Sequence, residues 1–496
     1  MKGHKDFASH ATPSLMENLE QWHQEDRYQQ IIDAIEKLPS DEQTPELISQ
    51  LARAYNNLAE PGDRSLFEKA VQLLESVEED FPNDHNWNFR MGYALYYLDR
   101  ELKARHYFEK ALEYRPGDED TQEFIRLCNK SLALPNSMKP FSQRTGEGWQ
   151  TFAEGEAALR QMMDAGSYGE AVVEECSRLL APAFSRPYFE IGRCEGKYDL
   201  ILSADGDRSR LFKLVYFKNH APKTVLENWN ILVGRQPSNG FELRMYDQSV
   251  STSDARVWVE ELEDRQIGLS IYCEKLVPLL KTEENRAYNL MGILLDQAIG
   301  EIAAIRYVGY MDLLEEPQDG ADIPLDELLG FIRGTLEKES SPVTADNLCE
   351  WYSAYEMKPQ EGDDWVLRKD VYVGVTACIP VVNAYYRADD SVMEDFHMDG
   401  AVPAFFYYPL DGIPRDRILD LRDKLEQEIS RAAGDSVIFT GGATGVECGY
   451  LDFIAWDFGA VLEAAVKVFA DSGLKEAFVH TFRRDVNGIC LKREDA

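Results

Sequence analysis

The chain has 496 residues, of which 44% are hydrophobic and 11% aromatic, so it can bury several hydrophobic cores and we expect two to four domains. Its 88 acidic and 52 basic residues give a formal charge of −36, which repels phosphate backbones and anionic membrane surfaces. This charge argues against general nucleic-acid binding and against a function on a membrane surface.

The N-terminal residues do not have the pattern of a secretory signal, because Lys2 and Lys5 are not followed by an apolar segment before Pro13. No run in the sequence is long and apolar enough to span a bilayer. The eight cysteines are scattered without a CxxC-type pair, which favours reduced thiols over a metal site or a disulfide framework. We therefore expect a cytoplasmic protein.

Small, aromatic and proline residues recur at fixed spacings between His85 and Asp118. Gly92 and Ala104 are small where two antiparallel helices must approach closely, and an aromatic residue lies one turn from another alanine on the packed face. The positions that carry the pattern are Met91, Gly92, Ala104, Phe108, Ala111 and Pro116. The segment resembles the tetratricopeptide repeat family, whose members are stacked helical hairpins that bind other proteins.

The same spacing occurs upstream, where Ala70, Leu74, Val77 and Pro82 repeat the second half of the pattern. A partner helix is expected over residues 46–58, and an earlier hairpin begins with a helix over residues 15–24. Three hairpins are about the minimum for a stacked array to bury a continuous core. With a capping helix over residues 118–133, we predict an all-α repeat array over residues 14–133.

The resemblance implies a concave groove lined by the first helix of each hairpin. It implies that Asn56, Asn88 and Tyr96 lie near a bound peptide. The alternative for the tyrosine is packing between repeats, and the alternative for the asparagines is solvation at helix ends. Basic residues are present in the array, but not in the pattern of the clamp with which some family members bind a C-terminal carboxylate.

Beyond the array, prolines and glycines predict a linker over residues 134–148. Residues 149–314 predict a helical pair followed by the order strand, helix, strands, helix, strand, which is typical of a ferredoxin-like (split βαβ) α+β sandwich. A helical connector is expected over residues 315–365, and the same order returns over residues 366–496 as a second sandwich. In element order alone, this last region is similar to the RNase E regulator B type of fold.

A histidine and two arginines lie beside aromatic residues at the end of the last predicted strand. His480, Arg483 and Arg484 could form an anion pocket in an otherwise acidic protein. The simpler interpretation, which we favour, is that His480 is a half-buried sheet residue and that the arginines pair with nearby carboxylates such as Asp452 or Asp457.

Two further segments have the composition of binding loops without the complete motif. In residues 389–400, Asp395, His397 and Asp399 mimic the opening of a calcium loop, but the twelfth position supplies no carboxylate. We interpret this segment as a solvated loop, with divalent metal binding as a minority alternative. The glycine-rich run at residues 440–445 is interpreted as a hairpin turn or bulge, because neither a helix nor the P-loop lysine follows it.

Our first hypothesis for function is a non-catalytic, cytoplasmic, bacterial adaptor whose repeat array binds a partner protein or peptide, with no metal and no cofactor. A second hypothesis is an acidic inhibitor or immunity-type protein that blocks a basic partner such as a nuclease, since opposite charge accelerates their encounter. A third is an enzyme with its site around His480, Arg483 and Asp452. No catalytic residues are predicted, because no motif for nucleophilic catalysis is present.

Overall fold

The computed structural model describes residues 13–137, 139–166, 169–194, 196–238, 240–337, 343–360 and 366–493. Within these residues the chain forms two compact units. The first unit comprises residues up to 141 together with residues 384–439 and 447–496, and the second comprises residues 142–383 and 440–446. The chain therefore leaves the first unit and returns to it, a division that the predicted boundaries at residues 134–148 and 315–365 did not anticipate.

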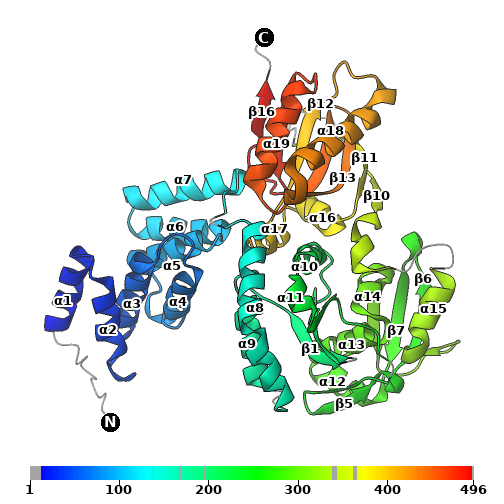
Figure 1. The fold of residues 1–496 in the computed structure, drawn as a ribbon, viewed down its shortest axis with the longest axis horizontal. Coiled ribbons are helices and arrows are strands. Elements are labelled where there is room, and N and C mark those ends of the chain that lie inside the picture. Colours follow the sequence, from blue (N-terminus) through cyan, green and yellow to red (C-terminus); the bar gives the residue numbers. More distant parts are fainter. Residues whose placement is uncertain are drawn as a thin grey trace. The chain divides into compact units, whose positions relative to one another are not determined.

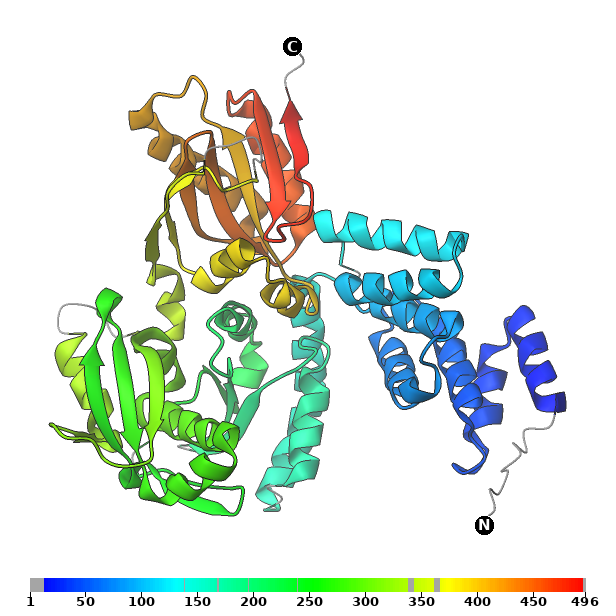
Figure 2. The ribbon, with the colours of Figure 1, turned by 180° about the vertical axis from the view of Figure 1, so that it is seen from behind.

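The predicted N-terminal helical region is confirmed. Figures 1 and 2 show its helices as antiparallel hairpins placed one after another, from the N-terminal end to a final single helix. They are α1 (Pro13–Gln24), α2 (Tyr28–Glu36), α3 (Pro45–Leu58), α4 (Arg64–Glu75), α5 (His85–Tyr97), α6 (Glu101–Tyr114) and α7 (Glu119–Ala133).

Local side chains determine where these helices begin. The side chain of Asp84 accepts a hydrogen bond from the backbone N–H of Trp87 at 2.6 Å, and Asp118 accepts one from the N–H of Thr121 at 3.1 Å. Such N-terminal caps satisfy amide groups that have no partner within the helix. The starts of α5 and α7 are therefore encoded by residues next to them in the sequence.

Small residues allow the two helices of the third hairpin to lie close together. A Cβ atom added at Gly92 would lie 2.9 Å from the ring of Phe108, which is closer than side-chain contacts normally allow. Ala104 and Phe108 are fully buried, and Trp87 donates a hydrogen bond from Nε1 to the carbonyl of Leu74 at 3.2 Å. The positions singled out by the repeat pattern thus lie at contacts between helices.

The predicted linker over residues 134–148 is too long, because helix α8 (Phe141–Asp164) begins within it. Gly148 lies inside this helix, where an added Cβ atom would lie 2.8 Å from the Cβ atom of Ala183. Gly148 therefore permits close packing of α8, although the composition of the segment suggested a turn.

Separate sheets make up the β structure of the second unit. The strands β1, β2 and β3 form one sheet in that order, in which β1 and β2 are antiparallel and β2 and β3 are parallel. A second sheet has the order β8-β7-β6-β9, and β4 and β5 form a hairpin. The strands are β1 (Phe189–Cys194), β2 (Lys197–Leu202), β3 (Trp229–Val233), β4 (Glu242–Met245), β5 (Gln248–Ser251), β6 (Arg256–Glu261), β7 (Ile267–Tyr272), β8 (Val308–Leu314) and β9 (Ile323–Pro324).

The strands expected to share one ferredoxin-like sheet over residues 149–314 are therefore divided between two sheets. The reason is the connection between β2 and β3, which runs through α10 and α11 and makes the two strands parallel neighbours. The helices of the unit that follow α8 are α9 (Glu170–Leu180), α10 (Arg210–Asn219), α11 (Lys223–Leu226), α12 (Val277–Thr282), α13 (Glu284–Ile299), α14 (Glu301–Tyr307) and α15 (Leu328–Thr335).

The C-terminal part of the first unit is an antiparallel sheet with helices on one face. Its strand order is β14-β12-β15-β16, and Figures 1 and 2 show α18 and α19 side by side against it. The elements are α17 (Ser391–His397), β12 (Val402–Pro409), α18 (Ile418–Ala433), β14 (Cys448–Ala455), α19 (Phe458–Asp471), β15 (Glu476–Thr481) and β16 (Ile489–Arg493), with α16 (Ile379–Arg387) preceding them.

The glycine-rich run at residues 440–445 is part of a strand, so it is not a hairpin turn; the alternative of a bulge agrees with the register shift in its pairing with residues 371–373. Strand β13 (Val437–Gly445) begins in the first unit beside β14, and its residues 440–445 belong to the second unit. There it pairs with β11 (Val371–Thr376), which also pairs with β10 (Ser353–Glu356). Gly441 has φ +144°, and a Cβ atom there would lie 2.1 Å from the carbonyl oxygen of Val375, so the glycine is required by close strand approach.

The acidic segment at residues 389–400 is also not a solvated loop. Most of it is helix α17, in which Met393, Phe396 and His397 are buried. Gly400 ends the segment with φ +82°, and a Cβ atom there would lie 2.4 Å from the carbonyl oxygen of Lys139. The apolar residues between the acidic ones are core residues. The comparison with a calcium loop considered only the acidic residues and did not use the spacing of the apolar ones.

Candidate functional site: a polar groove on the helical array

A groove with a volume of about 510 Å³ lies on the helical array of the first unit. It is lined by residues of α1, α3 and α5 and of the segment that leads into α7. We refer to it as the array groove. The first helix of each hairpin faces it, which is the surface on which stacked helical repeats bind their partners.

Helix α3 contributes four polar residues whose spacing places them on one face. Gln50, Arg53 and Asn57 lie at i, i+3 and i+7, and Asn56 follows Arg53 by three positions, so the four residues lie toward one side of the helix. The opposite side of α3 is apolar, and its leucine and alanine residues are buried in the core of the array. The amphipathic pattern of the helix therefore presents amide and guanidinium groups to the groove.

Helix α5 contributes a second row with the same spacing. Asn86, Phe89, Arg90 and Tyr93 lie at i, i+3, i+4 and i+7 and line the adjoining wall. The ring of Tyr93 lies 5.3 Å from the ring of Phe124, centroid to centroid, and burial raises the pKa of its phenol above the ordinary value. This row thus places a neutral aromatic surface next to polar groups.

Asn56 connects the two rows through a buried hydrogen bond. Its side chain is 2% exposed, and its Nδ2 donates a hydrogen bond to the carbonyl of Arg90 at 3.0 Å. Its Oδ1 is buried as well and accepts no hydrogen bond from the part of the chain that the structure describes. The amides that are accessible from the groove are those of Asn57 and Asn86, which are exposed.

Two arginines give the groove a positive centre. Arg53 forms an ion pair with Glu20 at 3.1 Å, and Arg90 donates from Nη1 to the hydroxyl of Ser49 at 2.6 Å. Burial, and next the charge of Arg53, lowers the pKa of Arg90 to about 10, so it remains protonated at neutral pH. Asp118 and other carboxylates also line the groove, so its charge is mixed.

Of the residues predicted for the groove, Asn56 lines it and the other two do not. Asn88 is buried and donates from Nδ2 to the carbonyl of Asp84 at 2.8 Å, within the first turn of its own helix. Tyr96 is half-buried and packs on Phe124, with the ring centroids 5.5 Å apart. These two side chains have packing roles, which was the alternative interpretation for the tyrosine.

Most of the residues that line the groove were missed from the sequence, although the signal was present. In α5 the lining positions are neighbours of the predicted ones, such as Phe89 beside Asn88. A step of one residue turns the side chain by about 100° around a helix, so the face must be assigned from the complete pattern.

The second predicted site is a set of buried ion pairs. Arg483 is 2% exposed and pairs with Asp390 at 3.3 Å and with Glu394, and its Nη2 lies 3.2 Å from Nδ1 of His397. Burial and the charge of Arg483 hold the pKa of His397 well below its ordinary value, so this imidazole is neutral and accepts the hydrogen bond. We call these four residues the Arg483 cluster.

His480 and Arg484 have contacts of the same structural kind. His480 is buried, its ring stacks on Phe405, and its Nε2 lies 3.1 Å from the carbonyl oxygen of Val486. Arg484 donates from Nη1 to the carbonyl of Tyr386 at 3.4 Å. The favoured interpretation of arginines paired with carboxylates describes Arg483 correctly, but its partners are Asp390, just before α17, and Glu394 of α17, and not Asp452 or Asp457.

The residues that the structure describes were also compared with the requirements of a metal site and of a membrane-spanning helix. They contain no group of three or more histidine, cysteine, aspartate and glutamate side chains placed to hold a metal ion. None of their helices has both the length and the apolar character needed to cross a bilayer. Comparison of the chain with protein-family models, with curated proteins and with solved structures finds no match.

Proposed function

We propose that this protein is a non-catalytic adaptor of the tetratricopeptide type that binds an extended peptide segment of a partner protein in the array groove. The observation that carries the proposal is the pair of polar rows on α3 and α5, in which Asn57 and Asn86 are exposed amides on adjoining walls of the groove. Amide side chains in this position can hydrogen-bond the backbone of an extended chain.

The groove has the chemistry that such a segment requires. Gln50 supplies a further amide group, while Phe89 and Tyr93 supply an apolar surface for a side chain of the partner. These residues lie on helices, so little conformational entropy is lost when the ligand binds. An anionic group on the partner would lie near the guanidinium groups of the groove. These groups are local positive charges on a protein whose net charge is negative.

We propose further that the C-terminal part of the first unit is a ferredoxin-like domain that supports the array. The chain order β12, α18, β13, β14, α19, β15 combined with the spatial order β13-β14-β12-β15 supports this, since it is the split βαβ arrangement. Contacts to the array also support it: the hydroxyl of Thr481 donates to the carbonyl of Leu132 at 3.2 Å, and Arg64 donates to the carbonyl of Met398 at 3.3 Å.

A cytoplasmic location is part of the proposal. It is supported by the cysteines, because all eight are free thiols in the structure, as expected for a reducing compartment.

The proposal is tested by selecting peptides from a random display library on the intact protein and measuring their affinity by fluorescence polarisation. Arg53→Glu reverses a charge at the centre of the groove and should weaken the selected peptide by roughly 30-fold. The matched control is Arg126→Glu on α7, whose side chain is 72% exposed and paired only with Glu123. The control should change the affinity by less than about 2-fold, since exposed pairs contribute little.

Equal affinity of the selected peptide for the intact protein and for Arg53→Glu would contradict the proposal. Circular dichroism of both variants shows whether the array keeps its helical content. A loss of affinity together with a loss of helicity would be assigned to unfolding, and the conservative variant Arg53→Lys would then be measured.

A further inference from the structure

The second unit contains a cavity that the proposed function does not use. It lies beyond the carboxyl end of β3, the strand that pairs in parallel with β2, and has a volume of about 320 Å³. In sheets with parallel strands, ligands bind at the carboxyl ends of the strands, and small-molecule sites begin at about 300 Å³. We call it the α15 cavity, because residues of α15 form one of its walls.

The floor of the α15 cavity is held rigidly. Glu301, which is fully buried, accepts hydrogen bonds from the hydroxyl of Ser203 and from the backbone N–H of Arg235, each at 3.0 Å. These donors follow β2 and β3, so one carboxylate ties together the ends of both strands. The guanidinium of Arg235 is itself paired with Glu190 at 2.7 Å and with Asp296 at 2.9 Å. The cavity is therefore formed without a ligand.

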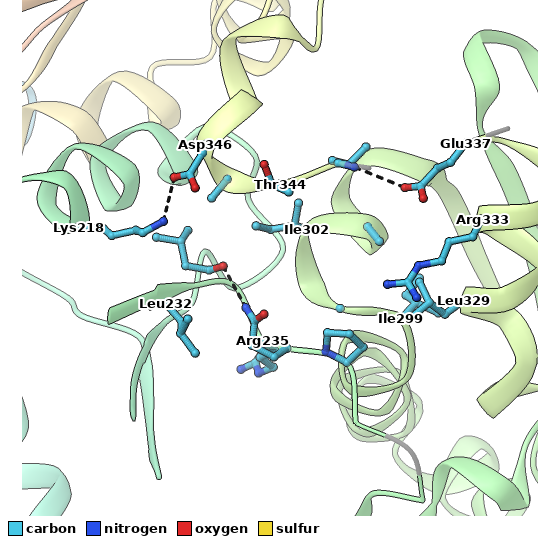
Figure 3. A pocket seen from close by; sticks show the side chains of 17 residues that line it. Lys218, Leu232, Arg235, Ile299, Ile302, Leu329, Arg333, Glu337, Thr344 and Asp346 are labelled. Atoms are coloured by element: carbon cyan, nitrogen blue, oxygen red, sulfur yellow. Dashed lines mark hydrogen bonds and ion pairs between the residues drawn. The ribbon is translucent and has the colours of Figure 1, made fainter. Parts of the chain in front are cut away.

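Its walls combine apolar and polar side chains. Leu232 of β3, Ile299 and Ile302 around the α13–α14 junction, and Leu329 of α15 all contribute to the lining. Figure 3 shows Ile302 near the centre of the view, between the two groups of charged side chains. This surface suits the hydrocarbon part of a ligand.

The charged side chains at the rim differ in how they are neutralised. Lys218 pairs with Asp346 at 2.8 Å, and the carboxylate of Glu337 accepts hydrogen bonds from the hydroxyl of Tyr307 at 3.1 Å and from a backbone N–H. Arg333 lies on the opposite side of the cavity from Lys218, as Figure 3 shows, and forms no ion pair or hydrogen bond with any residue that the structure describes. A positive charge is therefore available beside the apolar walls.

We infer that the α15 cavity binds a small organic anion with an apolar body. The anionic group lies against the guanidinium of Arg333, and the body packs on Ile299, Ile302 and Leu329. A carboxylate suits this position, because the planar guanidinium can donate two parallel hydrogen bonds to it. The inference concerns the second unit and is independent of the array groove.

The test uses three probes with the same apolar chain: octanoate, 1-octanol and octylammonium. Each is titrated into the intact protein, and binding is followed by ligand-observed NMR. Octanoate should bind with a Kd of about 1 mM or tighter, and its affinity should exceed that of 1-octanol by roughly tenfold, as a charge-assisted hydrogen bond implies. Octylammonium should bind most weakly.

Variants assign the binding to this cavity. Arg333→Met keeps an unbranched apolar stem at this exposed position and removes the charge, so it should weaken octanoate by about tenfold and leave 1-octanol unchanged. Ala303→Trp fills the cavity and should abolish binding of both. The matched control is Arg178→Met on α9, an exposed arginine paired with Glu175, which should change neither affinity.

Three results would overturn the inference: no binding of octanoate up to about 10 mM, equal octanoate affinity for the intact protein and Arg333→Met, or tighter binding of octylammonium than of octanoate. If Ala303→Trp fails to fold by circular dichroism, Arg333→Met alone decides, because its side chain is exposed and is not part of the core.

Discussion

The array groove and the Arg483 cluster lie in the same unit and contain the same types of residue, yet they differ in what those residues can do. Arg53 in the groove keeps 32% of its side chain exposed, whereas Arg483 keeps 2%. The groove also contains exposed amides, those of Asn57 and Asn86, while Arg483 is enclosed with the carboxylates of Asp390 and Glu394. A ligand therefore has access to the groove and not to the cluster.

The comparison shows that residue type alone does not identify a binding site. An arginine beside a histidine at the end of a strand suggested an anion pocket, but the carboxylates that neutralise Arg483 lie about ninety positions earlier in the sequence. In the groove, by contrast, the polar side chains come from two helices whose faces follow from local periodicity. Both arginines pair with carboxylates, so the two regions differ in how accessible their side chains are to solvent.

The largest effect is expected from breaking the Arg483 cluster. Arg483→Met leaves Glu394 and Asp390 without their cation, and we expect the free energy of unfolding to fall by about 3 kcal/mol in urea titrations. Arg126→Met, at an exposed pair, should change it by less than about 0.5 kcal/mol. The double variant Arg483→Met, Glu394→Gln should be more stable than Arg483→Met. If the double variant is no more stable than the single variant, the ion pair between Arg483 and Glu394 does not stabilise the cluster.

The next effect concerns ligand binding in the groove. Asn56→Leu removes the hydrogen bond that joins α3 to α5 while keeping the size of the side chain, so the two walls of the groove are held less firmly and we expect a selected peptide to bind about tenfold more weakly. Unfolding should change by only about 1 kcal/mol, because one hydrogen bond to the carbonyl of Arg90 is lost. Polarisation titrations and urea unfolding of the same samples separate the two effects. A loss of stability without a loss of affinity would make Asn56 a structural residue like Asn88.

A smaller effect is expected from the packing beneath the groove. Gly92→Ala places a methyl group 2.9 Å from the ring of Phe108, and this clash should outweigh the better helix propensity of alanine, with a net loss of about 1 kcal/mol. Thermal and urea unfolding measure the loss. Adding Phe108→Leu to Gly92→Ala should cost less than the sum of the two single changes, and simple additivity would show that the two residues do not conflict.

The smallest effect is a pH dependence at the start of α6. Burial, and next the charge of Asp99, raise the pKa of Glu101 above its ordinary value, so the folded state holds a proton that the unfolded state releases. The contribution of Glu101 to stability should therefore be greatest at low pH and fall as the pH rises above the usual range of a glutamate. In urea titrations at pH 5 and pH 8, Glu101→Gln should reduce this fall. An unchanged pH dependence would show that another group is responsible.

The sequence predicted the fold best where contacts are local. Gly92, Ala104 and Phe108 contact one another within one hairpin, and the caps at Asp84 and Asp118 act within one turn, so spacing alone located these helices. Residues 440–445 were taken for a turn because their pairing with β11 joins positions about seventy residues apart. Gly441 is required by its close approach to β11, a strand that is distant in the sequence. Local composition cannot show that contact.

The sequence predicted only part of the candidate site, because part of it also depends on contacts between distant residues. The repeat pattern indicated which helices line the groove, and Asn56, one of the residues that it suggested, is among the lining residues. It did not place Asn88 and Tyr96, since the direction of a side chain within a helix depends on the packing of the neighbouring helices. The partners of Arg483 could not be predicted, because they come from α17, a helix that the acidic composition of its segment had concealed.

The most direct test of the account is hydrogen exchange of the intact protein, measured by mass spectrometry with and without a selected peptide. The account predicts slower exchange in α3 and α5, the helices that line the array groove, and unchanged exchange in α17 and β15, which carry the Arg483 cluster or lie beside it. Protection of α17 and β15 without protection of α3 and α5 would contradict it, and would place the partner on the C-terminal part of the first unit.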